Sequence, residues 1–486
     1  MTTPAPSLQD KDRATLALGM TLCAMFLGLA INVLHGMYAS WALFWLTIGA
    51  IVCPAAVVLR PGAGMEWILR RRFTAILSVI AFLSACILLW QIDNDIEIGF
   101  LVALLAALGL LQATNLRVRR IPLLVAMLSA FCLASVFFFT SPRLGEYPNI
   151  DVFLFQQGAA NALQHGHDPY AVRFPNIYSA KNSSVFQDPP RFGPGTPFYG
   201  PGVVDDDGWL TYGFPYPPLS LLMVMPAYLL AGDCRYAQMI AVGLSALMMA
   251  TARPGRWGAL AALLFLVNPQ GLFVIGMSWT EPLLLFAFSL AMFCACRWRK
   301  GLPWALGLFF ATKQYTVLAL PVLLLLLEGP NLFKELLDMV AKAGLVVAAI
   351  TLPFFVWNPH DFIRSVVQLQ FVQPFRTDAL SYLVWIYHHN GGQSVPMWTP
   401  FVIVIPAAII GIWGCPRSPA GFAAAVTLIC VIFFAFNKQA FCNYYYFVIG
   451  TACWSVAAMR GQPDLRVAAG SAAIAAPSPV PLPSGL

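Results

Sequence analysis

The chain alternates long apolar stretches with short polar turns. A membrane-crossing helix needs about 20 apolar residues, and the first such stretches occupy 14–35, 38–59, 73–91, 98–115 and 121–140. Further candidates occupy 214–232, 236–251, 257–275, 278–296, 302–312, 315–328, 339–357, 398–415, 419–437 and 441–457. The pattern predicts an all-α polytopic membrane protein with about 12–14 transmembrane helices.

Positive charges mark one side of these spans. Arg60, the run Arg70–Arg72 and the cluster Arg117–Arg120 alternate with a turn at His35 and an acidic turn at Asp93–Glu97. Cytoplasmic loops carry the excess of Lys and Arg, so we expect the segment after Thr140 to emerge outside. Further along, the same rule places Arg297–Lys300 and Arg460 inside, and Lys313, the loop 358–397 and Lys438 outside.

One stretch does not fit a simple alternation of crossings. Between Phe214 and Trp279 the pattern contains one crossing too many. Either 214–232 dips into the membrane and returns, or a segment near Asn268-Pro269-Gln270 is a broken half-helix. Broken helices at membrane depth occur only where they are buried in protein or line a water-filled cavity. We therefore expect a cavity near the outer leaflet.

Composition supports the membrane assignment. The chain has 486 residues, of which 59% are hydrophobic and only 10% charged, whereas an average soluble domain is about 25% charged. The same figures exclude a disordered chain, which needs low hydrophobicity and high charge. The net charge of +7 is explained by basic residues in the cytoplasmic loops. The sequence contains no basic face interleaved with aromatic residues, so it does not predict nucleic-acid binding.

The polar segments divide the chain into regions. We assign 1–120 to an N-terminal membrane module of four spans and 121–460 to the functional core, which includes the outer loops 141–213 and 358–397. The end of the chain, 461–486, is rich in Ala, Ser and Pro. That composition is typical of a disordered tail, here on the cytoplasmic side.

The long outer loop contains the most informative motif. Asn149 or Asp151 can cap a helix, whose apolar face is supplied by Phe153, Phe155, Ala159, Ala160 and Leu163. Gly166 then ends the helix, and Asp168-Pro169 forms a turn. The pattern predicts an amphipathic helix at the outer interface with a carboxylate at its start.

An Asp after a span, followed by an amphipathic helix that closes in Gly166-His-Asp-Pro-Tyr170, resembles the GT-C superfamily of integral membrane glycosyltransferases. The likeness is to the bacterial polyprenyl-phosphate-mannose-dependent α-mannosyltransferases, and it covers about 121–460. Two further stretches fit that pattern, Phe214–Leu219 and Ala311–Gln314. The first four spans are additional to the usual arrangement of the family.

The resemblance implies an inverting transfer of a hexose, mannose being the expected sugar, from a polyprenyl-phosphate donor at the extracytoplasmic face. Residue by residue, it makes Asp151 the general base, and a carboxylate is chemically able to accept the proton of an attacking hydroxyl. The alternative role for Asp151 is helix capping alone.

The departing lipid phosphate needs a cation or hydrogen-bond donors. Lys313 is a lone cation in an apolar stretch, and such a residue needs a reason to be there. We assign it to donor-phosphate binding, with a snorkelling lysine as the alternative. Gln314 beside it is a second candidate, or an ordinary hydrogen-bonded amide. Arg364 and Arg376 are weaker phosphate candidates that are expected to be solvated.

The remaining candidate substrate-binding residues lie near the predicted outer ends of spans: His167, Asp168, Tyr170, Tyr216, Trp279 and Glu281. Trp279 also fits an interfacial belt, and Glu281 fits a helix N-terminal charge. A metal site at His165, His167 and Asp168 or at Asp205–Asp207 is possible but not favoured, because the spacing is loose and an acidic loop run is usually solvated. We assign no cofactor.

The expected partners are a polyprenyl-phosphate sugar donor, a lipid, glycan or protein acceptor, and membrane lipid, without nucleic acid. The expected location is the bacterial inner membrane, with the active site facing outward. The alternative function is a polytopic transporter or lipid-linked-sugar flippase. Transporters commonly contain internal repeats, and no repeat is detectable in this sequence.

Overall fold

The computed structural model describes residues 13–91, 148, 150–178, 199, 202–253 and 255–460. The predicted spans 98–115 and 121–140, the turn Asp93–Glu97, the cluster Arg117–Arg120 and the tail 461–486 lie outside the described residues. Within the described part the protein is helical, and β-structure is limited to isolated bridges. The prediction of an all-α polytopic membrane protein is confirmed.

The helices follow the predicted stretches closely. They are α1 (Ala14–Asn32), α2 (Ser40–Val58), α3 (Ala63–Gln91), α6 (Asp151–Gln164), α7 (Pro218–Ala231), α8 (Arg235–Ala252), α9 (Arg256–Leu266), α10 (Gly271–Gly276), α11 (Glu281–Arg297), α12 (Leu302–Phe310), α13 (Leu332–Trp357), α14 (Pro359–Ile363), α15 (Leu369–Val372), α16 (Tyr382–His389), α17 (Thr399–Gly414), α18 (Pro419–Ala435) and α19 (Cys442–Ala457). The segments η2 (Val33–Gly36), η3 (Arg299–Gly301) and η4 (Gln314–Leu326) are 3₁₀-helical, and η5 (Arg364–Gln368) is a π-helical turn.

One boundary differs from the sequence prediction. The helix expected over 73–91 begins at Ala63, so the run Arg70–Arg72 lies on α3 instead of in a loop. Straight-chain residues such as Met, Glu, Leu and Arg lose little freedom in a helix, and Arg70 lies 4.0 Å from Glu66 one turn earlier. The hydropathy pattern therefore located the apolar part of the helix and missed its polar first turns.

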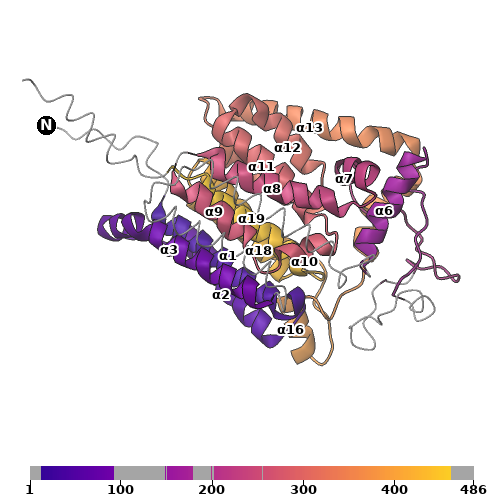
Figure 1. The fold of residues 1–486 in the computed structure, drawn as a ribbon, viewed down its shortest axis with the longest axis horizontal. Helices are drawn as coiled ribbons and strands as arrows, with labels where there is room; N and C mark the ends of the chain where they lie inside the picture. The colour runs from indigo at the N-terminus through magenta and orange to yellow at the C-terminus, as the bar shows by residue number, and fades with distance from the viewer. Residues whose placement is uncertain are drawn as a thin grey trace, which may run out of the picture.

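α18 and α19 form the centre of the bundle. Nearly every side chain of both helices is buried, and Trp454 donates a hydrogen bond of 2.6 Å to Ser289 on α11. Figure 1 shows α1–α3 on one side of this pair, and α8, α11, α12 and α13 on the other. The helices at the edges, such as α13, expose apolar side chains, as expected where lipid is the solvent.

The described residues contain four helices that are long and apolar enough to cross a membrane. They span Ala14–Gly36, Ser40–Val58, Ala63–Leu88 and Leu332–Trp357. Shorter apolar helices include α7, α9, η4, α17 and α18. The total of about 12–14 crossings remains a prediction.

The two ends of the bundle separate the charges as the sequence predicted. At one end, which we call the arginine end, Arg13 donates to the carbonyls of Leu59, Val57 and Gly414. Arg297 and Arg299 likewise donate to the carbonyls of Thr251 and Leu326.

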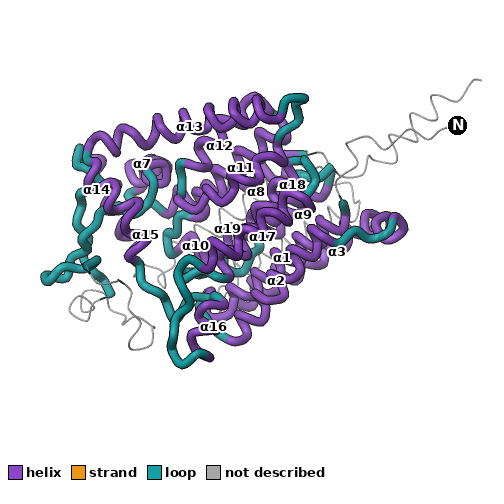
Figure 2. The backbone as a smooth tube through the Cα atoms, turned by 180° about the vertical axis from the view of Figure 1, so that it is seen from behind, coloured by secondary structure: helices purple, strands orange, loops and turns teal. Residues whose placement is uncertain are grey.

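At the opposite end, which we call the site end, loops from distant parts of the chain meet. Met37 forms a bridge with Ala379, and Leu380 donates a backbone hydrogen bond of 2.8 Å to Ala440. Viewed from behind, α14, α15 and α16 lie at this end (Figure 2).

The structure explains the surplus crossing between Phe214 and Trp279. α7 runs alongside α6. The backbone N–H of Phe214, which precedes α7, donates to the carbonyl of Pro169, which follows α6. The carbonyl of Gly232, at the end of α7, accepts a hydrogen bond from the side chain of Gln157 in α6. Both ends of α7 therefore lie at the site end, and α7 returns without crossing. The segment 257–275 is also broken, because α9 stops at Leu266 and α10 begins only at Gly271.

The break between α9 and α10 is buried in protein. Asn268 and Gln270 are almost fully enclosed, and Asn268 accepts a hydrogen bond of 3.0 Å from the backbone of Gln270. A small cavity beside the break is lined by Asn268 and Pro269 together with mainly apolar residues of α1, α3 and α9. The lining of this small cavity is mostly apolar, and the cavity near the outer leaflet remains a prediction.

Candidate active site

The N-terminus of α6 carries Asp151 at the site end. The helix is preceded by Ile150 in an extended conformation, and no side chain caps it. The carboxylate of Asp151 instead accepts a hydrogen bond of 3.0 Å from the hydroxyl of Tyr199. Its backbone N–H donates to the hydroxyl of Tyr178 over 3.2 Å. The carboxylate therefore has a hydrogen-bond partner in Tyr199, outside its own helix.

Burial raises the pKa of Asp151 above that of an ordinary carboxyl. The hydrogen bond from Tyr199 and the positive charge of Arg376 act in the opposite direction, because both stabilise the carboxylate. A carboxyl with a raised pKa is a better proton acceptor than an ordinary surface Asp. The environment therefore suits Asp151 to general-base chemistry.

A second charged group is formed by Lys313 and Glu281. The ammonium group of Lys313 makes an ion pair with Glu281 and donates a hydrogen bond of 2.8 Å to the hydroxyl of Thr280. Both charged side chains are almost completely buried. Lys313 is therefore not a snorkelling residue in this structure, because a snorkelling ammonium group would reach solvent.

Three tyrosines surround the Lys313 ammonium group. The rings of Tyr216, Tyr315 and Tyr444 lie 5.1, 5.5 and 5.4 Å from Nζ, within the range of a cation–π interaction. Tyr315 also donates to Glu281 over 3.3 Å. One oxygen of Glu281, Oε2, is buried without a hydrogen-bond partner. The pair therefore retains an acceptor that a polar ligand could use.

Tyr444 lies within electrostatic range of both charged groups. Tyr444 lies close enough to Glu281, Asp151 and Arg376 to sense all three charges. Arg376 was expected to be solvated, but its side chain is only 12% exposed and pairs with Asp378 over 2.6 Å. That part of the sequence interpretation is wrong, because the segment after α15 folds back over the site end and encloses Arg376. Arg364, in η5, is partly exposed.

The positions of the other predicted site residues differ. Gln314 donates to the carbonyls of Pro215 and Val366 over 2.9 and 3.1 Å, so its amide ties the loop before α7 to η5. Tyr170 is buried and donates to the carbonyl of Tyr216 over 3.0 Å. These two residues organise the wall of the site, which places Tyr216 against Lys313.

Three further predicted residues lie towards the edge. His167 is exposed, and Asp168 accepts a hydrogen bond of 2.9 Å from the backbone of Tyr170, as the predicted turn requires. Trp279 is partly buried and packs edge-on against Phe273. Asp151, Lys313, Tyr216 and Glu281 are thus brought together, whereas His167 is not among them.

The described residues contain no group of three or more His, Cys, Asp or Glu side chains that could hold a metal ion. In the acidic run Asp205–Asp207, Asp205 is already engaged by Arg173 and by two backbone N–H groups.

Sequence reasoning missed Tyr178, Tyr199 and Tyr315, and it named Arg376 only as a weaker phosphate candidate. The outer loop is rich in aromatic residues, Pro and Gly, but such a composition does not tell which ring faces Asp151. Tyr315 could have been predicted, because it lies two residues after Lys313 in an otherwise apolar stretch. The position of Arg376 depends on how a distant loop packs, for which the sequence carries no local signal.

Comparison with known proteins gives one structural likeness. No model of a protein family matches the chain, and no curated protein matches it. A solved structure described as ArnT from Cupriavidus metallidurans bound to undecaprenyl phosphate is similar to 73% of this chain, with 18% sequence identity and a TM-score of 0.42. The similarity covers 63% of that protein, so the chain matches less than two thirds of its length.

Proposed function

We propose that this protein is a GT-C-type membrane glycosyltransferase, which transfers a hexose, mannose being the expected sugar, from a polyprenyl phosphate to an acceptor at the outer face. The observation that carries the proposal is the environment of Asp151. Its carboxylate is oriented by Tyr199 and lies near the buried Lys313–Glu281 pair and Arg376. A carboxylate near cationic groups supports a transfer from a phosphate-linked donor, which needs a base and a stabilised leaving group.

The proposed reaction is a single displacement. The acceptor hydroxyl attacks the anomeric carbon of the sugar, its proton passes to Asp151, and the bond from that carbon to the phosphate oxygen breaks. The electron pair leaves with the polyprenyl phosphate, and the configuration at the anomeric carbon is inverted. No nucleotide or metal is needed to balance the step.

Lys313 is the proposed partner of the departing phosphate. Charge-assisted hydrogen bonds are the strong interactions available to a phosphate, and the ammonium group lies in a nearly solvent-free setting where its charge is poorly screened. Glu281 keeps the charge of Lys313 compensated before the donor arrives. Arg376, paired with Asp378, adds positive potential on the Asp151 side.

The test is turnover of a radiolabelled polyprenyl-phosphate hexose by the purified protein in lipid. We expect Asp151→Asn to abolish transfer while donor binding is retained, because the amide preserves the shape of the side chain but cannot accept the proton. Near wild-type turnover by that variant would remove Asp151 from the mechanism. Movement of the intact donor between leaflets without any transfer would instead identify a lipid-linked-sugar flippase.

A further inference from the structure

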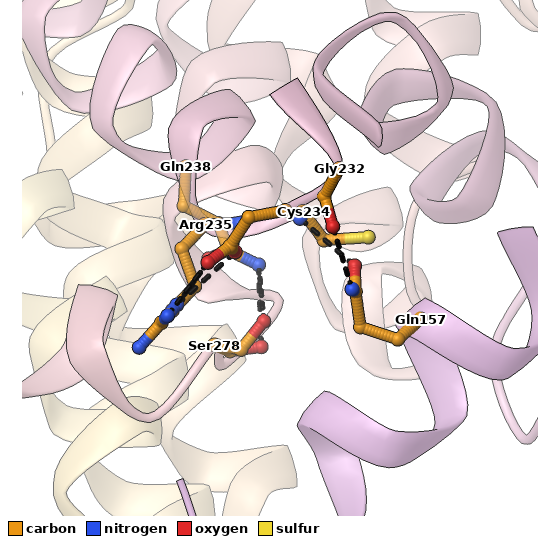
Figure 3. Close-up of polar contacts among 7 residues, drawn as sticks. Gln157, Gly232, Cys234, Arg235, Gln238 and Ser278 are labelled. Carbon is orange, nitrogen blue, oxygen red and sulfur yellow. Dashed lines mark hydrogen bonds and ion pairs between the residues drawn. The ribbon is translucent and has the colours of Figure 1, made fainter. Parts of the chain in front are cut away.

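Three buried polar side chains join α6 to the turn that precedes α11. Gln156 of α6, Gln238 of α8 and Ser278 before α11 all have 0% exposure. The amide of Gln238 donates to Gln156 Oε1 over 2.8 Å and to the hydroxyl of Ser278 over 3.0 Å. Figure 3 shows Gln238 directed at Ser278. Both glutamine amides also donate to the carbonyl of Ser278.

The backbone at Ser278 is strained. Its φ of 57° lies in the left-handed region, which residues other than glycine rarely adopt. Such a conformation costs about 1–3 kcal/mol and persists only where the surroundings hold it in place. Here two amide donors converge on the carbonyl of the same residue. The strained turn is thus held by α6 and α8 together.

The network links the two charged parts of the candidate site. Gln156 follows Asp151 on α6, and its amide also donates to the carbonyl of Val152 over 3.2 Å, within the first turn. On the other side, Ser278 lies just before Thr280 and Glu281, which both bind Lys313. A movement of Gln156 would therefore displace the base relative to the ion pair.

We propose that Gln156 is a positioning residue that fixes Asp151 relative to the Lys313–Glu281 pair, through Ser278 and Gln238. This inference rests on the proposed glycosyltransferase function. Gln156 itself is buried away from any reacting atom and acts only through the residues that it holds. Misplacement of reacting groups by about 1 Å can reduce a rate a hundredfold, so the link is expected to affect turnover.

The neighbouring Gln157 provides a matched control. Its side-chain amide N–H donates to the carbonyl of Gly232 over 2.9 Å, and its side-chain oxygen Oε1 accepts from the backbone N–H of Cys234 over 3.0 Å (Figure 3). Gln157 thus ties the same helix to the α7–α8 turn, and not to the turn before Glu281. Gln157 is only partly buried, whereas Gln156 is fully buried, so the two variants are compared by kcat, KM and the environment of Asp151 and not by stability.

The experiment compares Gln156→Met with Gln157→Met in the full-length protein in lipid. Methionine preserves the length of the side chain and removes the amide. We expect Gln156→Met to lower kcat by about tenfold to a hundredfold, with the KM for the polyprenyl-phosphate donor changed by less than about twofold. Gln157→Met should keep kcat within about twofold, and its thermal midpoint should fall less than that of Gln156→Met, because Gln157 is only partly buried.

A second measurement does not depend on sugar transfer. Labelling of Asp151 by a water-soluble carbodiimide and an amine, followed by peptide mass spectrometry, reports the environment of its carboxyl. Gln156→Met should change the labelling rate several-fold, and Gln157→Met should not. If the wild type transfers no sugar, the proposed function fails while this labelling still tests the positioning role. Equal kcat losses in the two variants, or equal labelling rates, would overturn the inference.

Discussion

The hydroxyl of Tyr199 donates a hydrogen bond of 3.0 Å to Oδ2 of Asp151, although 48 positions separate the two residues in the chain. The bond stabilises the charged carboxylate and so lowers the pKa of Asp151, against the larger effect of burial, which raises it. Tyr199 therefore tunes the pKa of the proposed base.

Tyr199→Phe is expected to shift the pH profile of transfer. The base works as a carboxylate, so activity rises with pH through the pKa of Asp151. Removal of the hydrogen bond raises that pKa further, and the acidic limb of kcat/KM moves to higher pH. The matched control is Tyr228→Phe, because the Tyr228 hydroxyl bonds to Asn161 further along α6. If the acidic limb of kcat/KM stays at the same pH in Tyr199→Phe, Tyr199 does not influence the pKa of the proposed base.

Lys313→Met is expected to weaken donor binding and to destabilise the protein. Removal of one partner of a buried ion pair costs about 3–5 kcal/mol, since the other charge is left uncompensated. The double variant Glu281→Gln/Lys313→Met should recover most of that stability, because neither charge remains, yet it should still bind the donor weakly. Thermal unfolding and binding of a fluorescent polyprenyl-phosphate sugar measure the two effects.

The control for this pair is Lys342→Met. Lys342 pairs with Asp338 on the exposed part of α13, and exposed pairs of this kind contribute about 0.3–0.5 kcal/mol. Its loss should leave both stability and donor binding nearly unchanged. If Lys313→Met binds the donor as tightly as the wild type, Lys313 has a structural role only.

Gly213→Ala is expected to disrupt the wall of the site. A Cβ atom at this position would lie 2.0 Å from the carbonyl oxygen of Tyr170, and a backbone atom cannot move aside cheaply. We expect a loss of about 1–3 kcal/mol in stability, as for other overpacked positions. Gly344→Ala, where nothing lies within 4 Å of the new methyl group, should be neutral or stabilising. Equal thermal midpoints for the two variants would contradict the close packing at Gly213.

Cysteine accessibility tests the predicted orientation. Ala231 at the end of α7 and Lys300 at the arginine end are both exposed. In intact cells, a membrane-impermeant maleimide should label Ala231→Cys, whereas Lys300→Cys should react only after permeabilisation, each compared with the parent protein. The opposite labelling pattern would invert the topology and place Asp151 on the cytoplasmic side.

The sequence by itself determined the helical segments and the distribution of charge. Apolar length gave the spans, Gly166 ended α6 where expected, and Asn268-Pro269 interrupted a helix, because each signal acts within a few neighbouring residues. Among the described residues, Arg297 and Arg299 lie at one end of the bundle and Lys313 lies at the other, since the hydrophobic core of a membrane excludes charge wherever it lies in the chain.

Only the tertiary structure decided which polar groups meet. The contacts of Asp151 with Tyr199, of Glu281 with Lys313 and of Gln156 with Ser278 join distant segments. Hydropathy does not specify these contacts, because lipid is as apolar as a protein core. The fully buried α18 therefore has the same apolar character as the lipid-exposed part of α13. The packing order of such helices, and with it the site, follows from shape and from the few buried hydrogen bonds.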